Sequence, residues 1–219
     1  MPLTRQRVLK TAVRLADKDG IESLSMRKLA RSLGVEAMSL YNHVASKGDL
    51  VDAMFELVMT EVELPPDSER WDTAIRSYAT AMHDALIRHP WAGNLAVGLG
   101  AGGVPRPSRL TQIDWLLRRL REGGFSRELT YHGYHVLDAH ILGFTLWELG
   151  HYAAAREIGP DFQLEQFVAE LLDGLRAQGY ADLAEHAEQH LSSEFGDVSA
   201  FELGLDLILD GLRRAKRRR

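Results

Sequence analysis

SMRKLARSLGVEAMSLYNHVASK, residues 25–47, contains two short stretches of helical apolar spacing that are separated by a glycine. Ser25 is a residue type that caps helix N-termini, and apolar residues follow it at helical spacing as far as Leu33. Gly34 tolerates the positive φ of a sharp turn, and Val35 then resumes the apolar pattern in a second short helix. This arrangement predicts a helix-turn-helix. Two ordinary core helices joined by a glycine are the alternative.

In a helix-turn-helix the second helix, here about residues 36–43, lies in the major groove of DNA, and the first crosses the backbone. The side chains that could reach base edges or the thymine methyl group are Arg27, Ala37, Met38, Ser39 and Asn42. Tyr41, His43 and Lys47 are residue types that hold phosphates. Tyr41 could instead be a half-buried core aromatic residue, and Lys47 a solvated surface charge.

The distribution of charge supports a small DNA-binding module. The whole chain of 219 residues carries a net charge of −5, which by itself argues against a nucleic-acid partner. Residues 1–50, however, hold nine basic and five acidic residues, whereas residues 51–219 hold 17 basic and 26 acidic ones. A basic head on an acidic body is expected when one module alone meets DNA.

The absence of cysteine excludes disulfides, thiolate metal sites and thiol catalysis. The N-terminus lacks the apolar core of a signal peptide, and no stretch approaches the roughly 18 continuous apolar residues of a membrane span. We therefore expect a cytoplasmic protein with no membrane partner.

Residues 25–47, with LYNHV shortly before Lys47 and a new helix, resemble the DNA-binding domain of the tetracycline repressor family of one-component regulators. The resemblance implies phosphate contacts from Tyr41, His43 and Lys47 and base contacts from Arg27 and residues 37–39. Ser25 belongs to the same predicted DNA-binding surface. Ala37 and Met38 stand where bulkier polar or rigid residues are common in the family, so the operator sequence does not transfer.

The rest of the chain contains helical patterns and no alternation of strand type, so the predicted fold class is all-α. Apolar spacing and capping signals predict further helices at about 4–19, 46–61, 68–89, 91–97, 108–122, 126–156, 164–178, 181–194 and 200–215. The sequence LPPD at 64–67 marks a domain boundary. We predict a DNA-binding domain at 1–47, a connecting helix at 48–64, and a ligand-binding and dimerisation domain at 65–219.

A broad apolar stripe on the helix at 200–215, together with part of the helix at 126–156, predicts the interface of a homodimer. A two-fold dimer reads a palindromic double-stranded DNA operator whose half-sites lie about one helical turn apart. The basic residues at 213–219 could add non-specific DNA affinity, although a disordered solubilising tail is the favoured interpretation.

Three patterns could be mistaken for an active site. GLGAGG at 98–103 has dinucleotide-binding spacing, but no buried strand precedes it, so we expect a flexible loop. HAEQH at 186–190 lacks the glutamate position of a zinc protease and indicates surface histidines. His132, His135 and Asp138 share roughly one side of a helix and could coordinate a metal, orient an organic ligand, or be buried and satisfied by neighbours.

The second half of the chain resembles the C-terminal domain of the tetracycline-binding members of the same family, through WD at 71–72, GFS at 124–126, LG at 142–143 and FELGLDLI at 201–208. The resemblance implies a pocket lined by Tyr78, Met82, Pro105, Ile113, Leu116, Leu117, Tyr134 and Asp138. We add His135 and Trp147, because aromatic walls with few polar groups suit a small-molecule pocket.

The residues that those members use for the drug and its magnesium ion differ here. Tyr78 and Met82 replace an asparagine and a phenylalanine that hold the drug, and Gly100 and Trp147 replace the histidine and glutamate of the metal site. Neither tetracycline nor magnesium is therefore expected, and no cofactor is predicted.

Together these features predict a homodimeric transcriptional repressor that binds a palindromic operator and is released by a small, largely apolar effector. A transcriptional activator with the same head is one alternative, and a sequence-nonspecific DNA-binding protein is another. A metal-dependent enzyme built on the histidine-rich helix is the competing hypothesis from a different class.

Overall fold

The computed structural model describes residues 2–100, 103–157, 164–192 and 199–217. All the regular structure in these ranges is helical, so the predicted all-α class is confirmed. The two glycine-rich loop residues 101 and 102, and the last two arginines of the basic tail, lie outside the described residues. No helix in the described ranges combines the length and the apolar character needed to cross a membrane.

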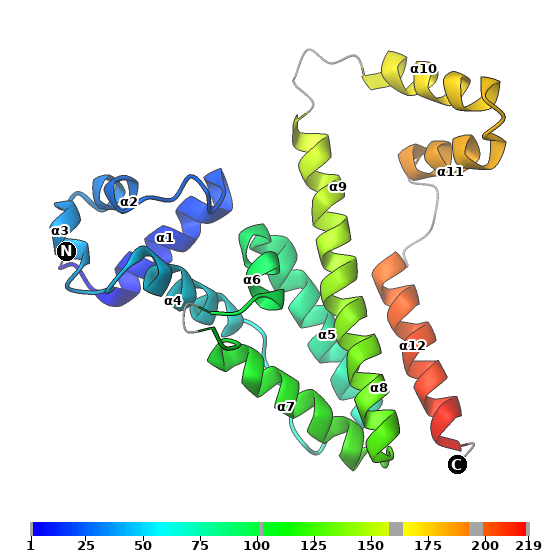
Figure 1. Ribbon diagram of the computed structural model, residues 1–219, viewed down its shortest axis with the longest axis horizontal. Coiled ribbons are helices and arrows are strands. Elements are labelled where there is room, and N and C mark those ends of the chain that lie inside the picture. Colours follow the sequence, from blue (N-terminus) through cyan, green and yellow to red (C-terminus); the bar gives the residue numbers. More distant parts are fainter. Residues whose placement is uncertain (1, 101–102, 158–163, 193–198, 218–219) are drawn as a thin grey trace.

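The N-terminal head consists of α1 (Arg5–Asp19), α2 (Met26–Leu33), α3 (Ala37–Leu40) and the first turns of α4 (Lys47–Met59) (Figure 1). Ser25 caps α2 by accepting a hydrogen bond from Lys28 N at 3.2 Å, and Gly34 ends it in the left-handed conformation with φ of 71°. Ser46 caps α4 in the same way through Asp49 N at 3.0 Å. The predicted helix-turn-helix is therefore present.

The second helix of the motif is shorter than the predicted range of about 36–43. It ends at Leu40, because the backbone then tightens into turns in which Tyr41 N donates to Met38 O and His43 N to Leu40 O. These bonds span three residues instead of the four of an α-helix. Tyr41 and His43 consequently lie in the turn after α3, not within it.

The body is built around α5 (Trp71–Arg88) and continues through η1 (Pro90–Ala92), α6 (Gly93–Val97) and α7 (Pro107–Glu122). One long helix then runs beside α5 in Figure 1, and it consists of α8 (Arg127–Asp138), the π-helical η2 (Ala139–Phe144) and α9 (Thr145–Glu157). The predicted helix at 126–156 is confirmed, but its π-helical segment was not predicted.

The C-terminal part contains α10 (Leu164–Ala177), α11 (Ala181–Ser192) and α12 (Ala200–Arg217). Figure 1 shows α10 and α11 as a hairpin that stands apart from the body, whereas α12 packs along α8, η2 and α5. The interpretation of residues 213–217 as a disordered tail was wrong. They continue α12, where Arg213 Nη2 lies 2.8 Å from the buried Asp72 carboxylate at the start of α5.

One continuous apolar core extends from α1 to α12. The central α5 supplies many of its buried side chains, and α4 buries Met54, Phe55, Val58 and Met59 between the head and the body. A helix that packs on both sides transmits a displacement from one to the other. The division of the chain at 47, 64 and 65 stays a prediction.

Candidate DNA-binding surface and ligand site

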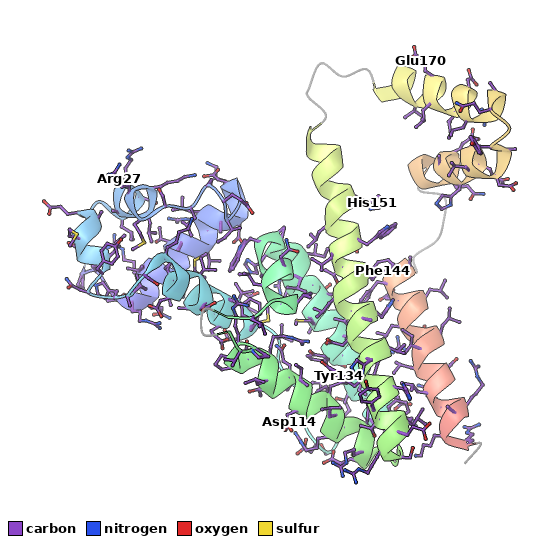
Figure 2. The ribbon with its side chains drawn as sticks, in the orientation of Figure 1. Arg27, Asp114, Tyr134, Phe144, His151 and Glu170 are labelled. Carbon is purple, nitrogen blue, oxygen red and sulfur yellow. The ribbon has the colours of Figure 1, made fainter. Side chains whose placement is uncertain are left out.

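The outward side of the helix-turn-helix carries most of the predicted DNA-binding side chains. Ser25, Arg27, Met38, Tyr41, Asn42 and Lys47 are exposed, and Ala37, Ser39 and His43 are half-buried. Met38 is 73% exposed and Tyr41 46% exposed, so Tyr41 is a surface residue and not a core aromatic. Figure 2 shows Arg27 projecting outward from α2.

The apolar residues of the same segment hold this surface in place. Leu40 and Val44 are buried in the head, and Leu29 and Leu33 fix the inner side of α2. In α2, α3 and the turns beside them, apolar residues thus face the core and polar residues face outward, as a DNA-binding helix-turn-helix requires. Contact of the exposed side chains with DNA stays a prediction.

In the body, a buried ion pair lies among the residues predicted to hold a ligand. Arg109 of α7 is 4% exposed, and its Nη2 donates to Asp138 Oδ1 of α8 at 2.7 Å. Its Nη1 donates over 3.4 Å to Tyr78 Oη and over the same distance to Gln112 Oε1. Tyr134 Oη donates to Asp138 Oδ2, also at 3.4 Å. We call Tyr78, Arg109, Gln112, Tyr134 and Asp138 the polar centre.

Burial raises the pKa of both phenols of the polar centre above the ordinary value of 10, which is already well above neutral pH. It raises the pKa of Tyr78 to about 12, and the negative charge of Asp138 adds to this effect while Arg109 opposes it. Burial likewise raises the pKa of Tyr134, again with a contribution from Asp138. Both hydroxyls therefore remain hydrogen-bond donors at neutral pH.

The remaining predicted ligand residues divide into three groups. Met82 and Leu116 are buried in the core, and Pro105, Ile113 and Leu117 are half-buried. Trp147 is 54% exposed and His135 is exposed, with His135 Nδ1 bonded to Tyr131 O of its own helix at 2.8 Å. The hydrogen bonds of the polar centre join Tyr78, Tyr134 and Asp138 of the predicted set.

The histidine-rich helix does not form a metal site within the part of the chain that the structure describes, where no group of three or more potential ligands could hold an ion. Asp138 instead pairs with Arg109, and His132 is exposed. His140 Nε2 donates to Phe201 O of α12 at 2.9 Å. For Asp138 and His140, the structure therefore agrees with the interpretation in which neighbouring groups of the protein satisfy the side chain by hydrogen bonds.

The N-terminal end of α7 is tied directly to α4. Arg106 is 5% exposed, and its Nε donates to Asp52 Oδ1 of α4 at 2.8 Å while its guanidinium lies 5.1 Å from the ring centre of Phe55. Ser108 donates to Glu56 through both its N, at 3.2 Å, and its Oγ, at 3.0 Å. One turn further along α7, Gln112 Nε2 lies 3.7 Å from Met59 Sδ.

A second connection joins α1 to the body. The Asp17 carboxylate accepts hydrogen bonds from His89 Nδ1 at 2.8 Å and from Trp91 Nε1 at 2.7 Å. The head is therefore held both by α4 against α7 and by α1 against η1.

Family models match most of this chain in two parts. The model described as "Bacterial regulatory proteins, tetR family" matches residues 8–54, and the model "Tetracyclin repressor-like, C-terminal domain" matches residues 64–215. The chain belongs to the TetR family. This TetR-family protein is a DNA-binding transcriptional regulator and not an enzyme, so the hypothesis of a metal-dependent enzyme was wrong.

Curated relatives extend the similarity over nearly the whole chain. The HTH-type transcriptional repressor DrrR1 from Streptomyces coeruleorubidus is 31% identical over 214 residues, which cover 96% of this chain and 77% of the relative. The class C tetracycline repressor protein from Escherichia coli is 28% identical over 217 residues, which cover 98% of this chain and 92% of the relative.

Solved structures agree with the TetR-family assignment. ActR from Streptomyces coelicolor, crystallised in complex with actinorhodin, superimposes with a TM-score of 0.67 at 28% identity and covers 99% of both chains. A possible TetR family transcriptional regulator from Streptomyces coelicolor A3(2) superimposes with a TM-score of 0.73 at 29% identity, over 97% of this chain and 100% of the other.

Sequence reasoning missed Arg109, Gln112 and Arg106 of this TetR-family protein. All three are polar residues within a helix, or just before one, whose apolar spacing looked regular, and all three are buried. Their spacing could have revealed two of these residues. Arg109 and Gln112 are three residues apart and therefore share a face of α7 with buried apolar residues such as Leu116.

Proposed function

We propose that this TetR-family protein is a homodimeric repressor that binds a palindromic operator and is released when a small, largely apolar effector binds in the body. The observation that carries the proposal is the position of α7. Its N-terminal end holds Asp52 and Glu56 of α4, and the same first turn brings Arg109 into the interior. Occupation of the body therefore acts on α4, whose first residue, Lys47, belongs to the proposed DNA surface.

The effector changes DNA affinity only through the difference in its affinity for two arrangements of the protein. Buried apolar side chains such as Met82 and Leu116 near the proposed site favour a largely apolar molecule. A molecule that separates α7 from its neighbours changes the hydrogen bonds that Arg106 and Ser108 make with α4. The two heads of a dimer then leave the spacing that two successive major grooves require.

The exposed apolar side chains of the body support a second copy as the partner. Five of them lie on the helices for which a homodimer interface was predicted, namely Tyr131 and Val136 of α8, Trp147 of α9, and Leu203 and Leu207 of α12. Exposed apolar surface of this kind marks interfaces in soluble proteins. A two-fold arrangement buries the same surface on both copies.

Selection of operators from a random DNA pool tests the DNA-binding part of the proposal. We expect the full chain to enrich a palindrome whose half-sites are centred about 10 base pairs apart, or a multiple of that distance. Enrichment of no palindrome, with equal affinity for all sequences, would support the sequence-nonspecific alternative. A reporter placed behind the selected operator then separates repression from activation, because removal of the protein raises transcription only for a repressor.

The oligomeric state tests the interface. Leu207→Asp places a charge on the proposed contact of α12 and is expected to convert the dimer to a monomer in sedimentation experiments. Leu110→Asp is the matched control, since Leu110 is also half exposed but lies on α7. A wild-type chain that sediments as a monomer at micromolar concentration contradicts the proposal.

A further inference from the structure

The polar centre makes incomplete use of its hydrogen-bonding groups. Arg109 has one short bond, to Asp138 at 2.7 Å, whereas its contacts with Tyr78 and Gln112 are both 3.4 Å long. The bond from Tyr134 to Asp138 is equally long. Such distances are beyond the usual range for strong hydrogen bonds, so the donors are only partly satisfied.

A buried donor beside the polar centre also lacks a partner. Trp115 is 3% exposed, its ring centre lies 5.1 Å from that of Tyr78, and its Nε1 has no hydrogen-bond acceptor among the described residues. A buried donor without a partner is rare in native proteins and costs free energy. The Trp115 ring thus lies against Tyr78, which itself accepts a hydrogen bond from Arg109.

Stability alone does not account for a charged pair at this position. An ion pair in a protein interior loses most of its attraction to desolvation, and apolar residues of similar volume often stabilise a fold as well or better. Arg109 and Asp138 come from different helices, α7 and α8, and they lie among residues expected to contact the effector. Charged groups in such a setting are candidates for a binding role.

We propose that the effector carries an ionised acidic oxygen, and that this oxygen replaces the carboxylate of Asp138 on the guanidinium of Arg109. This inference rests on the proposed function, because it names the chemical class of the effector. The exchange replaces one ion pair by another, so no isolated charge remains on Arg109 in the interior. The Asp138 side chain, which is 19% exposed, moves toward water when it is displaced.

The protonated hydroxyls of Tyr78 and Tyr134 suit the same ligand group. In the hydrogen bond with Arg109, Tyr78 Oη is the acceptor, so its own proton is available to a ligand oxygen. Tyr134 loses its acceptor when Asp138 moves and can donate to the ligand instead. An acidic oxygen accepts several such bonds, whereas an amide nitrogen at the same place would repel them.

The exchange also explains how an acid acts on the head. The bond between Arg109 and Asp138 joins α7 to α8 immediately before η2, so its loss removes one link between the two helices and lets the start of α7 shift. Arg106 and Ser108, within three residues of Arg109, carry the contacts with α4. Binding energy from the acidic group is thereby converted into a change at α4.

The test compares matched aromatic acids and amides as probes. A panel of mono- and polycyclic aromatic carboxylic acids, each paired with its carboxamide, is titrated against the full-length protein without DNA, and the dissociation constants are measured by calorimetry. We expect acids to bind at least about tenfold more tightly than their amides, because a charged oxygen accepts stronger hydrogen bonds than a neutral one. Equal affinities within the pairs, or binding of neither class, overturn the proposal.

Variants of the ion pair locate the effect. Asp138→Asn removes the competing carboxylate. We expect it to increase the affinity for acids by about tenfold and to leave the affinity for amides unchanged. The double variant Arg109→Gln with Asp138→Asn leaves no unpaired buried charge, so it keeps the fold, and it should bind acids and amides equally. Arg118→Gln, an exposed change on the same helix, is the control. An acid preference that survives in the double variant overturns the proposal.

The measurements distinguish this inference from the proposed function. Acid binding is measured without DNA, so a failed operator selection leaves the assignment of Arg109 intact. Conversely, a selected palindrome that no acid from the panel displaces, together with equal binding of acids and amides, refutes the acidic effector and leaves the repressor function standing.

Discussion

Arg106 forms an ion pair with Asp52 that fastens the start of α7 to α4, with 2.8 Å between Arg106 Nε and Asp52 Oδ1. The same guanidinium donates to Leu95 O at 2.6 Å and lies over the ring of Phe55. One buried side chain therefore holds three segments together, namely the end of α6, the start of α7 and the middle of α4. The contact is a joint between the DNA-binding head and the body.

Arg106→Gln tests this joint. Because the change removes a buried cation and leaves Asp52 with a weaker partner, we expect the free energy of unfolding to fall by about 2 kcal/mol. Amide hydrogen exchange in α4 should become faster, since α4 loses its hold on α7. Arg118→Gln removes an exposed pair with Asp67 and should cost at most about 0.5 kcal/mol. Equal losses in the two variants would contradict the assignment.

Lys47→Gln is expected to weaken binding to every operator sequence by a similar factor. A phosphate contact carries no sequence information, and each lost contact lowers the slope of log affinity against log salt by about 0.9, so a dimer should lose about 2. Gel shifts at several salt concentrations measure this slope. Lys18→Gln, at the exposed end of α1, should leave it unchanged.

Ser39→Ala is expected to act differently, because Ser39 is proposed to contact base edges. The preference at one or two positions of each half-site should relax by about 1–3 kcal/mol while the salt slope stays as in the wild type. Repeated selection from the random pool measures the preference. A uniform loss at all sequences would place Ser39 with the phosphate contacts instead.

Gly204→Ala tests the packing of α12 on the π-helical segment. A Cβ at Gly204 would collide with the imidazole of His140, whose ring is stacked on Phe201 at 5.0 Å. We expect a loss of about 1–3 kcal/mol in the free energy of unfolding. Gly211→Ala on the same helix meets nothing within 4 Å and should be neutral or stabilising by up to about 1 kcal/mol. Adding His140→Ala should remove most of the Gly204→Ala penalty.

The parts of the fold that follow from local chemistry could be predicted from the sequence. Ser25, Gly34 and Ser46 each act within four residues of their own position, and the structure places all three in the expected caps and turns. Most helix boundaries in the body agree because proline, glycine and capping residues act locally as well, although α5 begins at Trp71 and not near residue 68 as predicted.

The parts that depend on distant partners could not be predicted. Arg109 is recognisable as a buried charge only once Asp138, from the next helix, is placed beside it. Two contacts occur at the π-helical segment that helical spacing does not reveal. α12 packs against the segment, and Thr145 Oγ1 donates to Ile141 O at 2.5 Å. Apolar periodicity reports which face is inward, not which polar group meets another there.

Acidification is expected to destabilise the protein through His83. Burial lowers the pKa of His83 from its ordinary 6.5, although Glu148, 3.5 Å from Nε2, opposes the shift and His140 adds to it. Because the folded-state pKa lies below the unfolded value, the contribution to stability is fully present above pH 6.5 and is lost as the pH falls below it, by at most about 1.4 kcal/mol per pH unit. His83→Gln should flatten the pH dependence of urea unfolding between about pH 7.5 and 5.5, whereas His132→Gln, on the exposed side of α8, should not. A profile that His83→Gln leaves unchanged would assign the loss to another group.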